Sequence, residues 1–84
     1  MVEVIFAPKF KQSFSKIKDK LLKERIIKQF SKIKINPTIG KPMRNVRKGT
    51  RELYIPPFRL SYAYYIPSDT IYILEIYHKK EQNN

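Results

Sequence analysis

One stretch of the sequence determines how the chain must fold: residues 40–82, GKPMRNVRKGTRELYIPPFRLSYAYYIPSDTIYILEIYHKKEQ. It begins with a basic loop and continues with three runs rich in Ile and Tyr, residue types that favour strands. Pro56-Pro57 separates the first two runs, and Pro67-Ser68-Asp69 separates the last two. We therefore predict an antiparallel meander of three strands. Their expected bounds are 52–55, 58–66 and 70–77.

The residues before this stretch supply the layer that such a sheet needs on one face. Residues 2–6 alternate as a strand does, and Pro8 suits the first turn of a helix. Apolar residues then recur at helical spacing in two stripes, which are Phe10, Phe14, Ile17 and Leu21, followed by Leu22, Ile26, Phe30 and Ile33. The phase breaks at 18–20, where Asp19 suits an N-cap, and Asn36-Pro37 ends the second helix.

These elements predict one α+β domain spanning residues 1–84. The expected order is an N-terminal strand, a helical hairpin and the three-stranded meander. Both helices have one apolar side, so we expect them to pack together on one face of the sheet.

Alternation along the middle strand divides its side chains between two faces. Phe58, Leu60, Tyr62, Tyr64 and Ile66 share one side, and Arg59, Ser61, Ala63 and Tyr65 share the other. The apolar set must meet the helices, so we expect Arg59 to point to the uncovered face. His78 and Lys80 follow the third strand, at the same end of the sheet if the hairpin pairs symmetrically about its turn. We therefore expect these three groups at one mouth of the open face.

The charge of the chain indicates a polyanionic or acidic partner. The net charge is +11, and residues 9–51 contain fifteen of the eighteen Lys and Arg but only two acids, a net of +13. The loop after the helices is the densest part, and its candidate phosphate contacts are Lys41, Arg44, Arg47 and Lys48. The alternative for this loop is an ordinary solvated connection.

Several classes of protein are excluded by composition. There is no cysteine and only one histidine, so we expect no disulfide, no metal site and no cofactor. No apolar run approaches the roughly 20 residues needed to cross a bilayer, and the N-terminus lacks a signal-peptide pattern. We expect a cytoplasmic protein without a membrane partner.

The chain resembles the RelE/ParE superfamily of toxins from type II toxin–antitoxin operons. The resemblance rests on the GKPMR loop (40–44), FRLSY (58–62) and the closing HKKEQ (78–82), in this order over nearly the whole chain. It is nearest to RelE and HigB-type members. The resemblance implies an α+β sheet with a helical hairpin, cleavage of mRNA in the ribosomal A site, and inhibition by a cognate antitoxin, which we expect to be acidic.

The resemblance also implies roles for individual residues. Arg59 matches the arginine that contacts the scissile phosphate, and Lys80 matches a second cation near the C-terminus. His78 and Lys79 lie beside Lys80, and Arg51 lies where RelE proteins carry basic residues leading into this strand. RelE proteins also carry a later tyrosine that acts as a general base. The sequence has no tyrosine after Lys80, so we expect weaker activity.

Metal-independent RNA cleavage needs charge stabilisation at the phosphate and a group that transfers protons. Arg59 is the candidate for the first task and His78 for the second, since an imidazole titrates near neutrality. Alternatively, Arg59 pairs with Glu52 or Glu75, and His78 merely ends a strand. The leading hypothesis is a ribosome-dependent mRNA endonuclease with the ribosome, mRNA and an antitoxin as partners. The alternatives are a ParE-like inhibitor of DNA gyrase and a basic RNA-binding module or decayed toxin.

Overall fold

The computed structural model describes residues 2–45, 48–78 and 80 of the chain. A short strand is followed by two helices and then by four strands. The elements are β1 (Glu3–Phe6), α1 (Pro8–Ser15), α2 (Lys20–Ile35), β2 (Lys41–Pro42), β3 (Arg51–Ile55), β4 (Phe58–Tyr65) and β5 (Thr70–His78). A 3-10 turn at Ile66–Ser68 joins β4 to β5. Within the described ranges, neither helix has the length and apolar character that a membrane span requires.

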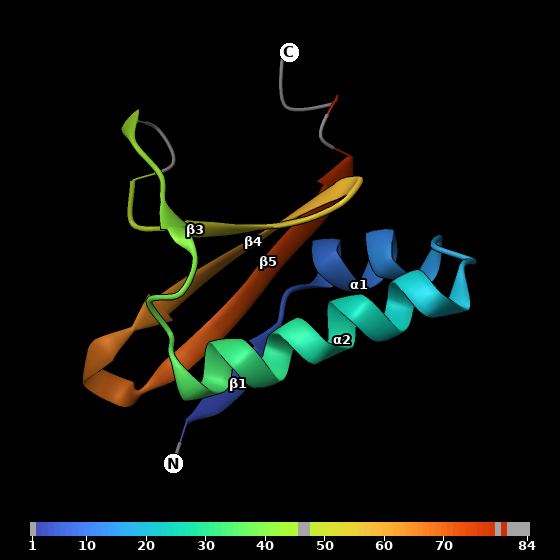
Figure 1. The fold of residues 1–84 in the computed structure, drawn as a ribbon. Helices are drawn as coiled ribbons and strands as arrows, with labels where there is room; N and C mark the ends of the chain where they lie inside the picture. Colours follow the sequence, from blue (N-terminus) through green and yellow to red (C-terminus); the bar gives the residue numbers. More distant parts are fainter. Residues whose placement is uncertain (1, 46–47, 79, 81–84) are drawn as a thin grey trace.

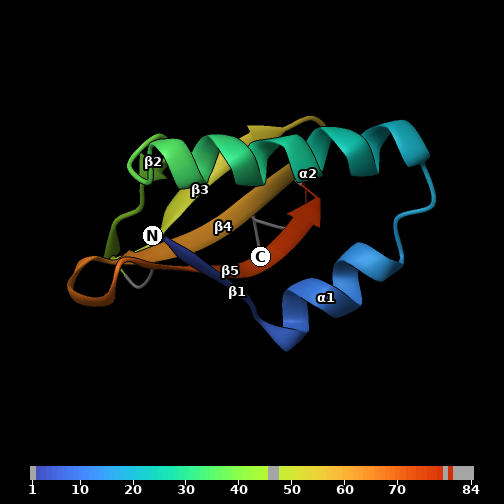
Figure 2. The same cartoon turned by 90° about the horizontal axis from the view of Figure 1, so that it is seen from below.

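The five strands form one mixed sheet in the order β1-β5-β4-β3-β2. β3, β4 and β5 pair antiparallel, as predicted, and β1 adds to β5 in parallel. Both helices lie on one face of the sheet (Figure 1, Figure 2). The predicted α+β architecture is therefore confirmed. The structure adds one strand that was not predicted. This is β2, a two-residue strand within the predicted loop, in which Lys41 lies opposite Glu52.

The helical hairpin has the capping residues that the sequence indicates. Pro8 begins α1, and the Asp19 side chain accepts a 3.2 Å hydrogen bond from the Leu22 backbone N–H in the first turn of α2. Asn36 ends α2. The prediction that Leu21 belongs to the buried apolar stripe is wrong. Leu21 is 73% exposed, and α2 turns Leu22 toward the sheet instead.

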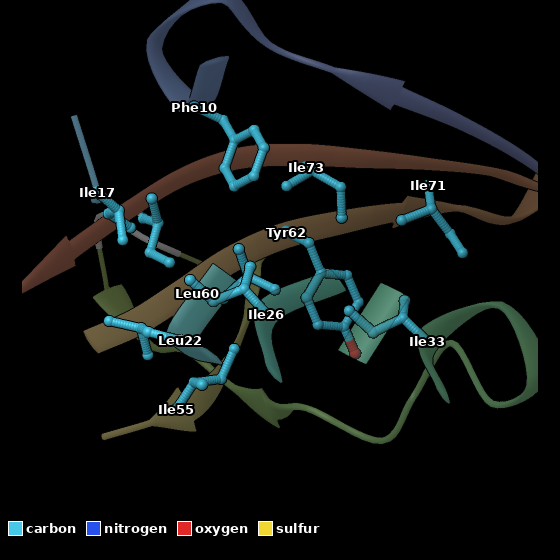
Figure 3. Packing of buried hydrophobic residues seen from close by; sticks show 11 residues of the cluster. Phe10, Ile17, Leu22, Ile26, Ile33, Ile55, Leu60, Tyr62, Ile71 and Ile73 are labelled. Atoms are coloured by element: carbon cyan, nitrogen blue, oxygen red, sulfur yellow. The ribbon is translucent and has the colours of Figure 1, made fainter. Parts of the chain in front are cut away.

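The core lies between the helices and the sheet. Figure 3 shows Leu60 and Tyr62 of β4 beside Ile26 and Ile33 of α2, and all four side chains are fully buried. The other buried members are Phe10, Ile17, Leu22, Ile55, Ile71, Ile73 and Ile76. Burying a side chain of this size stabilises the fold by about 1.5–3 kcal/mol. The even-numbered residues of β4 thus face the helices as predicted. Ile66, which we expected to end the strand on the same side, lies in the turn that follows it and is 74% exposed.

One extra residue in β5 interrupts its pairing with β4. Ser61 lies opposite Glu75, and the next residue of β4, Tyr62, lies opposite Ile73. Leu74 is therefore the extra residue of a β-bulge. Such a bulge shifts the alternation of side chains along its strand by one position.

The bulge sets the faces that the last residues of β5 occupy. Ile73 and Ile76 both belong to the core, although three positions separate them. Strict alternation from Ile73 would bring Tyr77 to the helices and His78 to the open face. The structure has the reverse arrangement. His78 lies opposite Phe58, which packs against the core on the helix side, and Tyr77 is buried outside this core cluster.

The Tyr62 hydroxyl fastens the loop after α2 to the sheet. It donates a 2.7 Å hydrogen bond to the Pro37 carbonyl and accepts a 2.9 Å hydrogen bond from the Gly40 N–H. Gly40 packs so closely that an added Cβ would lie 2.7 Å from the Tyr62 ring, so the site has room only for glycine. Burial raises the pKa of Tyr62, although the Gly40 hydrogen bond and the nearby Arg51 charge act in the opposite direction.

We expect Tyr62→Phe to lower the free energy of unfolding by about 1–3 kcal/mol, because the buried Gly40 N–H loses its acceptor. Urea unfolding at neutral pH measures the difference. Tyr65→Phe is the matched control, since Tyr65 is 56% exposed and its loss should change stability by less than about 0.5 kcal/mol. Equal stabilities of the wild type and Tyr62→Phe would show that the hydroxyl does not hold the loop.

The raised pKa of Tyr62 predicts that the folded state loses stability in alkali. Because the pKa of Tyr62 is raised by folding, the native state keeps a proton that the unfolded chain releases. The resulting stabilisation is complete below pH 10.0, the ordinary tyrosine value, and is lost as the pH rises through the higher pKa of the folded state. The stability difference between the wild type and Tyr62→Phe should therefore shrink above about pH 10. Urea unfolding of both proteins below and above about pH 10 tests this prediction. A stability difference that does not change with pH would refute it.

Candidate functional site on the open sheet face

The face of the sheet opposite the helices carries a cluster of polar and aromatic side chains. Arg59 lies in β4, opposite Tyr54 of β3 and Tyr77 of β5. Glu52 is two residues before Tyr54 and shares its face, and Lys41 of β2 lies opposite Glu52. The prediction that Arg59 faces away from the helices is therefore confirmed.

Glu52 is a buried carboxylate within this cluster. Its side chain is 3% exposed and has donors on two strands. One oxygen accepts a hydrogen bond from the Tyr77 hydroxyl, and the other lies 3.4 Å from Arg59 Nη1. A buried carboxylate is costly unless charged or hydrogen-bonding partners surround it, so these contacts explain how β3 tolerates an acid here.

Arg59 is held from two sides but keeps unused hydrogen-bonding capacity. Its guanidinium carbon lies 5.5 Å from the centre of the Tyr54 ring, and its side chain is 27% exposed. Among the described residues, Nε of Arg59 is buried and has no hydrogen-bond partner. A guanidinium offers five donors and matches the geometry of a phosphate, so the part of the Arg59 side chain that remains exposed can receive an anion.

A pocket of about 270 Å³ opens beside this guanidinium. Its lining is Lys41, Met43, Glu52, Tyr54 and Arg59. Two cations, one buried carboxylate and one aromatic ring thus meet in a space suited to a phosphate group. Such a site can bind an anion, stabilise charge that develops on it, and accept a proton.

From the sequence, Glu52 is predicted only as an alternative partner for Arg59 and not as a member of a site. The signal was nonetheless available. In the β3–β4 hairpin, the two residues Pro56 and Pro57 separate the strands, and Ile55 pairs with Phe58. This register puts Glu52 opposite Ser61 and diagonal to Arg59, within reach of a long side chain.

His78 does not lie on this face, and the expectation that it shares an open surface with Arg59 is wrong. The bulge at Leu74 turns it to the helix side, where its ring centre lies 5.7 Å from that of Phe58. There it borders a hollow of about 480 Å³ at the helix junction, together with Leu22. The two residues do lie at the same end of the sheet, as predicted, since Arg59 pairs with Tyr77.

Arg51, a predicted RNA contact, forms hydrogen bonds within the chain. Its guanidinium donates hydrogen bonds to the carbonyls of Thr38 at 3.1 Å and Gly40 at 2.8 Å. Arg51 also lies opposite Tyr62, on the helix side of the sheet. It therefore helps Tyr62 to hold the loop and does not line the pocket of Arg59.

The remaining predicted cations that the structure describes are exposed. Lys41 lines the pocket, and Arg44 and Lys48 are exposed in the loop that follows. Lys80 is exposed, and its backbone N–H donates to Nδ1 of His78 at 3.2 Å. Arg47 and Lys79 lie outside the described residues.

Several solved structures share this fold. The toxin–antitoxin complex RelBE2 from Mycobacterium tuberculosis matches with a TM-score of 0.79 and 24% identity, over 92% of this chain and 96% of that one. The YoeB/ParE toxin from Agrobacterium tumefaciens matches with a TM-score of 0.81 and 13% identity, over 90% and 96%. The YoeB dimer from Staphylococcus aureus gives 0.75 and 22%, over 92% and 97%. No curated protein sequence matches the chain.

The sequence itself identifies the family. Residues 4–83 match the family model described as the ParE toxin of the type II toxin–antitoxin system parDE. The match covers both helices, strands β2 to β5 and all of β1 except Glu3, and it includes the cluster around Arg59. The chain therefore belongs to the ParE toxin family of type II toxin–antitoxin systems.

Proposed function

We propose that this toxin stops translation by cutting mRNA on the ribosome, with Arg59 bound to the phosphate that is cut. The observation that carries the proposal is the partly exposed guanidinium of Arg59, which borders a pocket that Lys41 also lines. Members of the superfamily that the sequence resembles cut mRNA in this way. The reaction needs no metal, because the two cations supply the positive charge.

The surroundings of Arg59 suit stabilisation of a transition state. Glu52 and the Tyr54 ring hold the guanidinium before any substrate arrives. A preorganised cation of this kind loses little energy to reorganisation when negative charge develops on a phosphate. Alignment of the attacking 2′-hydroxyl can supply roughly 7–11 kcal/mol more of the barrier reduction. In this proposal the ribosome provides that alignment, so the isolated protein has weak activity.

The helix layer offers a separate surface for binding RNA. The exposed cations of α2 are Lys20, Arg25, Lys28, Lys32 and Lys34, and this helix has a single acid, Glu24. Such a surface attracts the phosphates of ribosomal RNA, and this attraction becomes weaker as salt is added. An acidic antitoxin fits the same charge, and solved structures of this fold include complexes with antitoxins. We include such an antitoxin in the proposal.

A second candidate is a ParE-like inhibitor that binds DNA gyrase and performs no chemistry. The position of His78 favours it, since the structure removes the predicted proton-transfer group from the face of Arg59. The family model, which is described as the ParE toxin of parDE, agrees with it. This candidate predicts broken DNA and arrested replication in place of cut mRNA.

We expect Arg59→Ala to abolish growth arrest and to reduce the appearance of new mRNA ends by about 100-fold or more, the effect of removing one donor to a transition state. Controlled expression in a bacterial host, followed by mapping of mRNA 5′ ends, measures both. Lys11→Ala is the matched control, because Lys11 is an exposed cation on α1 that belongs neither to the pocket of Arg59 nor to the basic surface of α2.

The results separate the candidates. New mRNA ends in the wild type that disappear in Arg59→Ala support the proposal. Growth arrest with broken DNA and intact mRNA would establish the gyrase candidate instead. Salt-dependent RNA binding without toxicity would leave only a basic RNA-binding module.

His78→Ala should cut mRNA within a few-fold of the wild-type rate, because the His78 ring packs against Phe58 on the helix side of the sheet. The same mapping of mRNA ends measures it. Thermal unfolding of the purified variant provides the control, since loss of the ring contact also affects stability. A loss of cutting as large as that of Arg59→Ala, in a folded variant, would show that His78 reaches the substrate.

A further inference from the structure

We propose that Glu52 is the proton acceptor of this toxin, the group that deprotonates the attacking 2′-hydroxyl of RNA while Arg59 holds the phosphate. This inference rests on the proposed cleavage of mRNA. Glu52 would perform the proton transfer that the sequence suggested for His78, which lies on the other face of the sheet. Glu52 is one of the residues that line the pocket of Arg59, and one of its carboxylate oxygens lies 3.4 Å from Nη1.

The position of Glu52 is chemically suited to this task. A general base must lie within hydrogen-bond reach of the proton that it takes, or one water away. A substrate phosphate that contacts both Arg59 and Lys41 would stand directly beside Glu52, because the three residues line one pocket. The adjacent 2′-hydroxyl would then lie near the carboxylate. Within this pocket lining, Glu52 is the one acidic side chain.

Tyr77 is a positioning residue for this base. Its hydroxyl donates to Oε2 of Glu52, while Oε1 is the oxygen that faces Arg59. A carboxylate held by donors on two different strands has a fixed orientation toward the pocket. The bulge at Leu74 is what brings the Tyr77 hydroxyl to this face.

The proposed step balances without a metal or an oxidant. Glu52 takes the proton of the 2′-hydroxyl, and the 2′-oxygen forms a bond to phosphorus. The bond from phosphorus to the 5′-oxygen breaks, and water supplies the proton for that leaving oxygen. The products are a 2′,3′-cyclic phosphate and a 5′-hydroxyl end, and Glu52 returns its proton to solvent.

The competing explanation is that Glu52 only neutralises Arg59 and supports the sheet. The groups facing Glu52 are Arg59, Tyr77, Tyr54 and Lys41, so its removal alters the local charge in either case. A test must therefore read out proton transfer as well as stability. The pH dependence of cleavage and the chemistry of the new ends do so.

The experiment uses the purified full-length toxin and ribosomes carrying a defined mRNA, with single-turnover cleavage rates measured across acidic to neutral pH. We expect Glu52→Gln to bind ribosomes normally but to cleave at least 100-fold more slowly. The wild-type rate should rise with pH until the base is ionised, and this acidic limb should vanish in Glu52→Gln. Wild-type products should carry 2′,3′-cyclic phosphate ends.

Glu75→Gln is the matched control, because Glu75 is a carboxylate on the same face that pairs with Lys9 at 3.6 Å and lies outside the pocket. It should leave the rate and the pH profile unchanged. If Glu52→Gln does not fold, Glu52→Asp serves in its place, since it keeps the charge but withdraws the carboxylate by one methylene. We then expect roughly tenfold slower cleavage with the acidic limb retained.

Each result bears on a different claim. Cleavage by Glu52→Gln, or by Glu52→Asp, at the wild-type rate overturns the assignment of Glu52 but leaves the proposed function standing, provided that Arg59→Ala remains inactive. Absence of cleavage by the wild type on programmed ribosomes overturns the proposed function itself. A slow Glu52→Gln that keeps the wild-type acidic limb assigns Glu52 a supporting role and also overturns the inference.

Discussion

A single inserted residue, Leu74, governs what each face of the sheet presents. Because of this bulge, Ile73 and Ile76 can both enter the core, although simple alternation would place them on opposite sides. The same shift delivers Tyr77 to the open face, where its hydroxyl meets Glu52. Without this bulge, the buried carboxylate would lose the Tyr77 donor, and His78 would turn to the open face. The polar cluster and the apolar core therefore depend on the same irregularity.

Most of the fold could be predicted from the sequence because its signals are local. Helical spacing, the N-cap at Asp19 and the prolines of the β3–β4 turn each mark an element boundary. The two-residue strand β2 gave no such signal, since Lys41-Pro42 has neither the length nor the composition of a strand. The bulge left only an indirect signal. Strict alternation from Ile71 and Ile73 would turn the charged Glu75 toward the helices, and the extra residue Leu74 brings Ile76 there instead.

The candidate site was predictable in part, for the same reasons. Alternation along β4 was enough to orient Arg59, since its neighbours on either side are apolar and buried or half-buried. The contact with Glu52 follows from a tight hairpin of known register. The face of His78 depends on the bulge at Leu74, for which the position of Glu75 in the alternation gives only an indirect signal. Loss of regularity in a strand is therefore where motif-based assignment of catalytic residues is weakest.

The glycine that admits no side chain also ties the chemistry of the pocket to the stability of the core. Gly40 rests against the Tyr62 ring on the helix side of the sheet, and the next residue, Lys41, reaches the pocket on the other side. A substitution that displaces the phenol would therefore move a cation toward or away from a bound anion. In a chain this small, variants selected for greater thermal resistance should carry altered anion affinity as an unselected trait.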